Sequence, residues 1–490
     1  MQLRSLVFAS VLILAGCSSP LTPPVVSAQP DFNPLTQDVK WADCEVGFEC
    51  ATVLAPLNWL SENKEFVNLE MIRKSGTQDL PPLLVNPGGP GSSGYDWLRD
   101  GYDTLGSKDL RSKFQLIAFD PRGVQHSTAV TCTDTQAKDE LYYGQSGSEY
   151  GSEADLAWTQ ETMNRFVESC LGNSPDTGYF NTQQAARDLE MFRVILGMPE
   201  LDYLGYSYGT LLGATYAALF PDKVGKMVLD GAIDPTISSG ENLVNQVAGF
   251  DGALRNYLEE CLGQSLCPFS GTVDEGIARI AGFLAARELK TLPTDFDREL
   301  GVSAALSGII AALYSQDSWV YLSQAFAEAF NGDGSTMLLL ADFYNDRDTN
   351  NDSYLSNINE ANAAINCADE PRVLVDHGAI NQQIRQASEV FGKYFESTDL
   401  GCAPWPEGKG LVSLDFGVRL ANGPLVVGTT NDPATPYSQA VSLSKILDGA
   451  KLLTFNGEGH TAYGSNFCVD ALVESYLAGE DLGQGDLTCS

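Results

Sequence analysis

The pentapeptide GYSYG at residues 205–209 has the Gly-x-Ser-x-Gly spacing of a nucleophile elbow. The apolar run LDYL precedes it and TLLGATYAALF follows it, which predicts a strand, a sharp turn and a helix. On such a turn the serine hydroxyl is pushed out from the backbone, and the glycines let strand and helix approach closely. We interpret Ser207 as a candidate nucleophile. The alternative, a serine in a glycine-rich turn, has to be judged from the rest of the chain.

A serine hydroxyl needs a base before it can attack a carbonyl. The chain has three histidines. His126 precedes Ser207, which is the wrong chain order for folds that carry this elbow, where nucleophile, acid and histidine follow one another. His377 lies in a predicted helical region, whereas His460 lies in the glycine-rich stretch FNGEGHTAYG directly after the last predicted strand. We therefore predict His460 as the base and the other two as structural or surface residues.

The acid is expected after a strand between the nucleophile and the base. The stretch PLVVGTTNDPATP places Asp432 just beyond a predicted strand, where it would hold the imidazole in the useful tautomer and stabilise its charged form. Asp230, in VLDGAIDP, is the alternative, because some hydrolases carry their acid after the preceding core strand. We favour Asp432 and interpret Asp230 and Asp234 as turn or packing residues.

A developing oxyanion needs two positioned N–H donors. One is predicted to be the amide of Tyr208, next after the nucleophile. The other is expected in NPGGPGSSG at residues 86–94, where glycines let the backbone approach a substrate. We assign Gly89, with Gly88 as the alternative, and a glycine-rich turn without function is the remaining interpretation.

These residues require a scaffold that brings strand ends together. Most of the apolar segments are continuous rather than alternating, as expected for strands covered on both faces. Residues 182–197 form an amphipathic pattern that ends at Gly197 and predicts a helix. Alternating strands and helices predict a mostly parallel α/β sheet, with strands at 66–72, 81–86, 114–120, 200–207, 226–232, 423–430 and 450–456.

Residues 240–404 interrupt this alternation with three or more helical patterns and no clear strand. We predict a helical cap at 240–404, inserted between a first core part at 41–239 and a second at 405–490. Within it, DRDTNNDS resembles a calcium loop, but Asn351 stands where such a loop needs glycine and Asn357 where it needs glutamate. An acidic surface loop is therefore predicted, and no metal site.

The N-terminus has the pattern of an export signal. Arg4 is followed by the short apolar run LVFASVLIL, and LAGC ends at Cys17. The small residues before Cys17 resemble a bacterial lipobox, which implies cleavage after residue 16 and lipid on Cys17; an ordinary secretory signal is the alternative. Residues 17–40 are proline-rich and predict a tether. We expect an exported protein of the cell envelope, anchored by lipid to a bacterial membrane on its periplasmic or extracellular face.

Eleven cysteines are present, and setting Cys17 aside leaves ten, an even number in an exported chain. Sequence does not fix which cysteines pair. The absence of paired CxxC motifs argues against structural zinc. Pairing of neighbours along the chain would give Cys44–Cys50, Cys132–Cys170, Cys261–Cys267, Cys367–Cys402 and Cys468–Cys489.

The formal net charge of −35 argues against binding to nucleic acid and against electrostatic docking on anionic lipid. It favours ligands that carry amines, or else it serves to keep a well-solvated surface. The hydrophobic share of 43% is that of a globular chain, without a bias towards disorder.

Five motifs in chain order resemble the secreted tripeptidyl-aminopeptidase and prolyl-aminopeptidase-like branch of the α/β hydrolases: NPGGPGSSG, FDPRGVQHS, GYSYGT, NDPATP and GEGHTAYG. The resemblance runs from about residue 40 to 490 and implies an α/β-hydrolase fold with a helical cap, a C-terminal segment that carries acid and histidine, and no cofactor. It implies Ser207, Asp432 and His460 as the triad of a serine hydrolase. Asn86 stands where prolyl aminopeptidases usually have histidine, and Gln125 replaces a common glycine, which leaves prolyl specificity open.

Members of this branch remove residues from free peptide N-termini, and some relatives are described as carboxylesterases. In related aminopeptidases, cap carboxylates bind the substrate ammonium, and INCADEPRV at 365–373 offers Glu370 with Asp369 for this role; a solvated acidic turn is the alternative. We expect a monomeric serine exopeptidase acting on peptides with a free N-terminus. The alternatives are an esterase with the same triad and a non-enzymatic binding lipoprotein.

Overall fold

The structure, a computed structural model, describes residues 26–27, 32–62, 65–132, 135–370, 376–396 and 401–490. The predicted export signal and Cys17 lie outside these residues. Within the described part of the chain, none of the helices combines the length and apolar character needed to cross a membrane.

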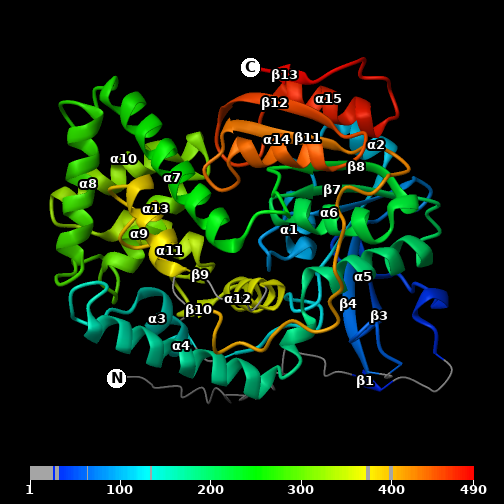
Figure 1. Cartoon of the computed structure of the whole chain (residues 1–490), viewed down its shortest axis with the longest axis horizontal. Coiled ribbons are helices and arrows are strands. Elements are labelled where there is room, and N and C mark those ends of the chain that lie inside the picture. The colour runs from blue at the N-terminus through cyan, green and yellow to red at the C-terminus, as the bar shows by residue number, and fades with distance from the viewer. Residues whose placement is uncertain (1–25, 28–31, 63–64, 133–134, 371–375, 397–400) are drawn as a thin grey trace, which may run out of the picture.

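A large mixed sheet forms the centre of the molecule (Figure 1). Seven neighbouring strands run parallel, and an antiparallel group completes one edge. The mostly parallel α/β sheet predicted from the sequence is therefore confirmed. The parallel strands, in spatial order, are β13 (Leu487–Cys489), β12 (Lys451–Glu458), β11 (Leu425–Asn431), β8 (Val224–Asp230), β7 (Leu201–Tyr206), β5 (Pro82–Asn86) and β6 (Gln115–Phe119). The antiparallel group is β4 (Glu65–Lys74), β3 (Phe48–Pro56) and β2 (Ala42–Glu45), and β1 (Val26–Ser27) also pairs with β4.

Helices cover both faces of the sheet. Because successive residues of a strand point to opposite faces, neighbouring residues of one strand pack against different helices. In β5, Leu84 packs with the core that includes α5 (Thr182–Ile195), α6 (Tyr208–Leu219) and α14 (Tyr437–Ile446). Its neighbours Leu83 and Val85 pack instead with α1 (Gly94–Gly101), α2 (Lys108–Lys113) and α15 (Phe467–Leu477). Burial on both sides explains why these strands are continuous apolar runs in the sequence.

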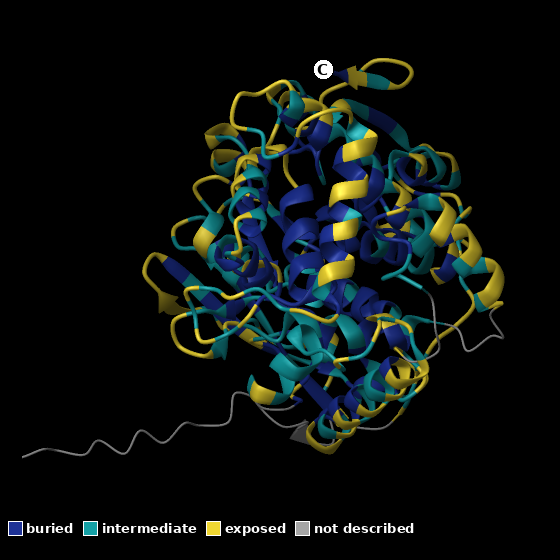
Figure 2. Ribbon diagram, turned by 90° about the vertical axis from the view of Figure 1, so that its left-hand side faces the viewer, coloured by how far each residue is buried: buried dark blue, intermediate teal, exposed yellow. Residues whose placement is uncertain are grey.

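A helical unit with its own hydrophobic core lies beside the sheet (Figure 1). The helices of this unit are exposed on their outer side and buried on the side that faces the unit's interior. Figure 2 shows them from the outer side. The helices of this core are α7 (Ser239–Leu262), α8 (Val273–Arg287), α9 (Val302–Leu313), α10 (Trp319–Phe330), α11 (Ser335–Tyr344) and α13 (His377–Ala387). The buried apolar residues of α12 (Ile358–Asp369) pack instead with the sheet core that includes α5 and α6. An earlier segment, α3 (Thr135–Tyr143), also packs against α9, and α4 (Glu153–Asn173) packs beside α3.

The stretch that resembles a calcium loop forms a small hairpin in this unit. Its strands are β9 (Arg347–Asp348) and β10 (Ser353–Tyr354). Arg347 forms ion pairs with Asp352 and, at 2.7 Å, with Asp139 of α3. Asn357, at the position where a calcium loop needs glutamate, accepts a hydrogen bond from the main-chain N–H of Gln125 at 3.0 Å.

All five cysteine pairs expected from neighbours along the chain are disulfides, so this prediction is confirmed. Cys367–Cys402 joins the end of α12 to the segment that returns to the sheet. Cys468–Cys489 fastens β13 to the first turn of α15, next to the segment that carries His460.

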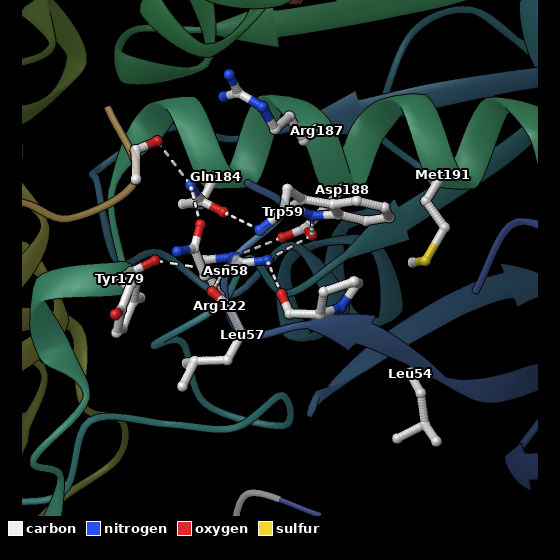
Figure 3. A network of polar contacts seen from close by, with 12 residues as sticks. Leu54, Leu57, Asn58, Trp59, Arg122, Tyr179, Gln184, Arg187, Asp188 and Met191 are labelled. Atoms are coloured by element: carbon white, nitrogen blue, oxygen red, sulfur yellow. Dashed lines mark hydrogen bonds and ion pairs between the residues drawn. The ribbon is translucent and has the colours of Figure 1, made fainter. Parts of the chain in front are cut away.

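A buried ion pair joins the antiparallel edge of the sheet to α5 (Figure 3). Arg122, from the FDPRG turn after β6, is 1% exposed and donates to both carboxylate oxygens of Asp188 in α5, at 2.6 and 2.8 Å. The guanidinium also donates to the carbonyl of Leu57, and Trp59 donates to Asp188 at 2.8 Å. Because both charged side chains are buried, the two charges depend on each other for solvation.

Candidate active site

Ser207 occupies a strained turn between β7 and α6. Its φ of +52° lies in the left-handed region that non-glycine residues rarely adopt. A side chain at position 205 would meet the carbonyl oxygen of Gly209 at 2.5 Å, and one at 209 would meet Asn86 Oδ1 at 2.9 Å. The two glycines of the elbow are therefore required by the close approach of strand, turn and helix.

His460 and Asp432 meet at the carboxyl ends of β12 and β11. The Nδ1 atom of His460 lies 2.9 and 3.0 Å from the two carboxylate oxygens of Asp432. The main-chain N–H groups of Ala434 and Thr435 both donate to Asp432 Oδ1 at 2.9 Å, which fixes the carboxylate. With Nδ1 donating to Asp432, Nε2 is left as the proton acceptor.

The helical unit contacts the histidine through Tyr314. The main-chain N–H of His460 donates to the carbonyl of Tyr314 at 2.8 Å, and the two rings meet edge to face with centroids 5.4 Å apart. Tyr314 follows α9, so the position of the base depends on the helical unit as well as on the sheet.

The environment of His460 favours its protonated form. Burial lowers the pKa of the imidazole, but the charge and hydrogen bond of Asp432 and the charge of Asp230 outweigh burial and raise it. The imidazolium that forms when a base removes a hydroxyl proton is thus stabilised in place.

Asp230, the alternative acid, faces main chain rather than the imidazole. Its carboxylate accepts the N–H groups of Ala462 at 2.9 Å and Tyr463 at 2.7 Å, in the loop that follows His460. Its carbonyl accepts the N–H of Ser207 at 2.8 Å. Burial raises the pKa of Asp230 to about 6 despite these hydrogen bonds. Asp230 therefore connects the elbow to the histidine loop. Asp234 accepts the N–H and hydroxyl of Thr236 in a local turn.

The glycine-rich loop after β5 lies against the elbow. A side chain at Gly88 would come within 3.0 Å of Ser207 Cβ and 3.2 Å of the Tyr208 nitrogen. The amide of Gly88 already donates to Asn86 Oδ1 at 3.0 Å, which favours Gly89 as the donor from this loop. Tyr208 is the first residue of α6, a position whose N–H has no acceptor within the helix. Asn86, where prolyl aminopeptidases have histidine, thus serves to shape the loop.

Ser207 and His460 line one cleft of about 350 Å³. Its other walls come from Pro87 of the glycine-rich loop, from α1 and from the loop after His460. Strand ends and the loops that follow them therefore bring the predicted nucleophile and base together, with Asp432 behind the base.

Asp369 and Glu370, predicted to bind a substrate ammonium, are not among the residues that line this cleft. Asp369 accepts the main-chain N–H of Thr182 at 2.8 Å and also its hydroxyl, and burial raises its pKa to about 6. The same hydroxyl lies 2.7 Å from the phenol oxygen of Tyr208. Asp369 thus supports α5 and the elbow helix from behind. Glu370 accepts a hydrogen bond from the hydroxyl of Ser239 at 2.8 Å.

The other two histidines lie apart from the cleft. His126 packs on Tyr95, and its Nε2 lies 3.1 Å from Asp96. His377 begins α13. Three residues of the site were not predicted from the sequence: Thr435, Asn86 as a loop support, and Tyr314. Only Thr435 had a local signal, its place three residues after the acid.

Comparison with known proteins agrees with the geometry. An α/β-hydrolase-fold family model matches residues 81–273, and a model described as TAP-like protein matches 388–489. Serine protease Hip1 of Mycobacterium tuberculosis is 32% identical, over 96% of this chain and 94% of that protein. The chain belongs to the tripeptidyl-aminopeptidase-like branch of the α/β hydrolases. This α/β hydrolase is also 34% identical to carboxylesterase B of M. tuberculosis, over 95% of this chain and 91% of the relative. A tripeptidyl aminopeptidase of Streptomyces lividans is 27% identical, over 92% of this chain and 86% of that protein.

The family assignment and the names of these relatives make the protein a serine hydrolase. The resemblance identified from the five sequence motifs is confirmed at the level of the family. Gln125, which departs from the family glycine, has a φ of +24°, and Asn357 holds it there.

Proposed function

We propose that this serine hydrolase is an exopeptidase that releases short N-terminal peptides or single residues from peptides with a free amine. The observation that carries the proposal is that His460, which contacts Asp432 through Nδ1, lines one cleft with the strained Ser207. Relatives named serine protease and tripeptidyl aminopeptidase support a peptide substrate.

In the proposed reaction, His460 Nε2 accepts the proton of Ser207 Oγ as the oxygen attacks the scissile carbonyl. The amides of Gly89 and Tyr208 hold the oxyanion, where the N-terminus of α6 adds a favourable dipole. His460 then gives its proton to the leaving amine, and the acyl-enzyme on Ser207 is hydrolysed by water that His460 activates. Asp432 keeps the imidazole oriented throughout. No cofactor takes part in this scheme.

For recognition of the amine, Glu370 remains the proposed group, because both oxygens of Asp369 have a structural partner in Thr182. Substitution Glu370→Gln is expected to raise KM for free-amine peptides while leaving blocked substrates unaffected. The matched substitution Glu241→Gln, at an exposed position in the first turn of α7, is expected to change neither.

We further propose that the protein is exported and anchored as a monomer by lipid on Cys17. The five disulfides support an oxidising compartment. Replacing Cys17 by alanine should move the protein from the membrane fraction to the soluble fraction, and recovery of the variant in the membrane would contradict the anchor.

An esterase with the same three residues is the second candidate, and the 34% identity to carboxylesterase B favours it. A panel of chromogenic substrates separates the two: aminoacyl and tripeptidyl amides with a free amine, the same compounds with a blocked amine, and short-chain esters. We expect the free-amine amides to have the highest kcat/KM. Fast hydrolysis of blocked amides or esters, with none of the free-amine amides, would reject the exopeptidase proposal.

A further inference from the structure

Three aromatic rings line the cleft beside Ser207 and His460. Trp97 comes from α1, Tyr206 ends β7, and Tyr463 lies in the loop after His460. The rings of Trp97 and Tyr206 meet edge to face, with centroids 5.7 Å apart. The ring of Tyr206 also stacks on that of Tyr463, with centroids 6.3 Å apart. Rings from three separate segments thus form a continuous apolar surface next to the reacting groups.

Three hydroxyl groups of this lining already have partners within the protein. Tyr463 donates to Glu474 at 3.1 Å. Thr104 and Ser465 donate to main-chain carbonyls at 2.9 and 2.7 Å. A bound group therefore meets ring faces and edges, and it need not supply hydrogen-bonding atoms to these three hydroxyl groups.

The cleft also differs from the rest of the molecule in charge. Among the described residues that line it, none is Asp, Glu, Lys or Arg, although the chain carries a net charge of −35. A charged side chain that entered here would lose water without gaining an opposite charge, which disfavours its binding.

We propose that this cleft is a subsite for an apolar, preferably aromatic, side chain on a residue next to the scissile bond. Its volume of about 350 Å³ lies in the range of sites that bind small organic groups. Aromatic pairs prefer edge-to-face or offset contacts with centroids about 4.5–7 Å apart. Trp97 and Tyr463 offer such contacts to an aromatic ring of the substrate. The inference rests on the proposed function, since it takes Ser207 as the nucleophile and a peptide as the substrate.

The test compares kcat/KM for two series of free-amine peptides. One series varies only the residue that donates the scissile carbonyl, and the other only the residue that donates the amine, each as Ala, Phe, Lys or Glu. We expect Phe to exceed Ala by at least about 10-fold in one series, the low end of what an added hydrophobic contact contributes. Lys and Glu should fall below Ala in that series. The series in which kcat/KM depends on the varied side chain shows on which side of the scissile bond the subsite lies.

The variants assign this preference to the rings. Trp97→Ala should bring the Phe-to-Ala ratio close to one, whereas Trp97→Phe, which keeps a ring, should retain most of the preference. Tyr321→Ala, at a side chain 56% exposed on α10, is the control and should leave the ratio unchanged. Equal rates for Phe and Ala in both series, or a preference that survives Trp97→Ala, would overturn the subsite.

Failure of the subsite and failure of the proposed function give different results. An enzyme that cleaves free-amine peptides without side-chain preference keeps the function and loses the subsite. An enzyme that cleaves only esters loses the exopeptidase function. The same variants are then compared on benzyl and methyl esters, where the subsite still predicts a benzyl preference that Trp97→Ala removes.

Discussion

Asp432 and Asp230 lie at the carboxyl ends of the neighbouring strands β11 and β8, but their carboxylates contact different groups. Both are buried, at 3% and 0% exposure. Asp432 faces the imidazole of His460 at 2.9 Å, whereas Asp230 faces two main-chain N–H groups of the loop that follows this histidine. Two acids thus lie at the carboxyl ends of neighbouring parallel strands, and the group that each acid contacts decides which one orients the base.

The largest expected effect comes from the acid that touches the ring. Asp432→Asn should lower kcat/KM by about 10⁴, because an amide does not enforce the tautomer with Nδ1 protonated. Steady-state kinetics measures the loss, and circular dichroism checks that the variant is folded. A larger loss for Asp230→Asn than for Asp432→Asn would exchange the roles assigned to the two acids.

Asp230→Asn should have a smaller effect, a loss of about 10- to 100-fold in kcat/KM, because a loosened loop displaces the imidazole. The charge of Asp230 raises the pKa of His460, so its removal should also move the acid limb of the pH–rate profile to lower pH. Asp234→Asn, on the same segment but in a local turn, is the matched control. A loss of rate without movement of the acid limb would leave Asp230 only a structural role.

The wild-type enzyme should lose activity on acidification while it gains stability. The base must be neutral, so kcat/KM should fall as pH drops through the raised pKa of His460. Burial raises the pKa values of Asp230 and Asp369 to about 6, above the ordinary 3.8. Their contribution to stability is therefore complete below the ordinary value and is lost as pH rises through about 6. Thermal unfolding should show a higher midpoint at about pH 5 than at about pH 8; the reverse order would contradict these shifts.

The smallest expected effect on activity belongs to a third buried acid, Asp188, whose partner is Arg122 near the antiparallel edge (Figure 3). Asp188→Ala should reduce the free energy of unfolding by about 3–5 kcal/mol, because it leaves a buried guanidinium unpaired. Activity of the folded fraction should stay within a few-fold of wild type. Asp100→Ala, which removes an exposed pair with Arg99, should cost less than about 1 kcal/mol in the same denaturation experiment.

The sequence predicted those parts of the molecule that local patterns specify. Ser207 was found from strand, turn and helix signals within a few residues, and the seven predicted strands all correspond to strands of the sheet. The antiparallel strands β2 and β3 were not predicted. In β3, buried and more exposed residues largely alternate, a weaker signal than the continuous apolar runs of the parallel strands.

Contacts between distant segments were beyond local patterns. An amphipathic helix reveals that one face is buried, but not which partner covers it. The carboxylate of Asp369 was expected at the substrate, and the structure places it on Thr182, 187 residues away along the chain. Tyr314 also meets a residue that is distant along the chain, His460, and nothing in the residues around Tyr314 indicates that contact.

The most direct test of Ser207 as the nucleophile is covalent labelling of the folded protein with a fluorophosphonate probe, followed by peptide mass spectrometry. One adduct is expected, on Ser207, that is absent from Ser207→Ala and forms much more slowly in His460→Ala. An adduct on another serine, or none in folded wild-type protein, would contradict the assignment of Ser207 as the nucleophile.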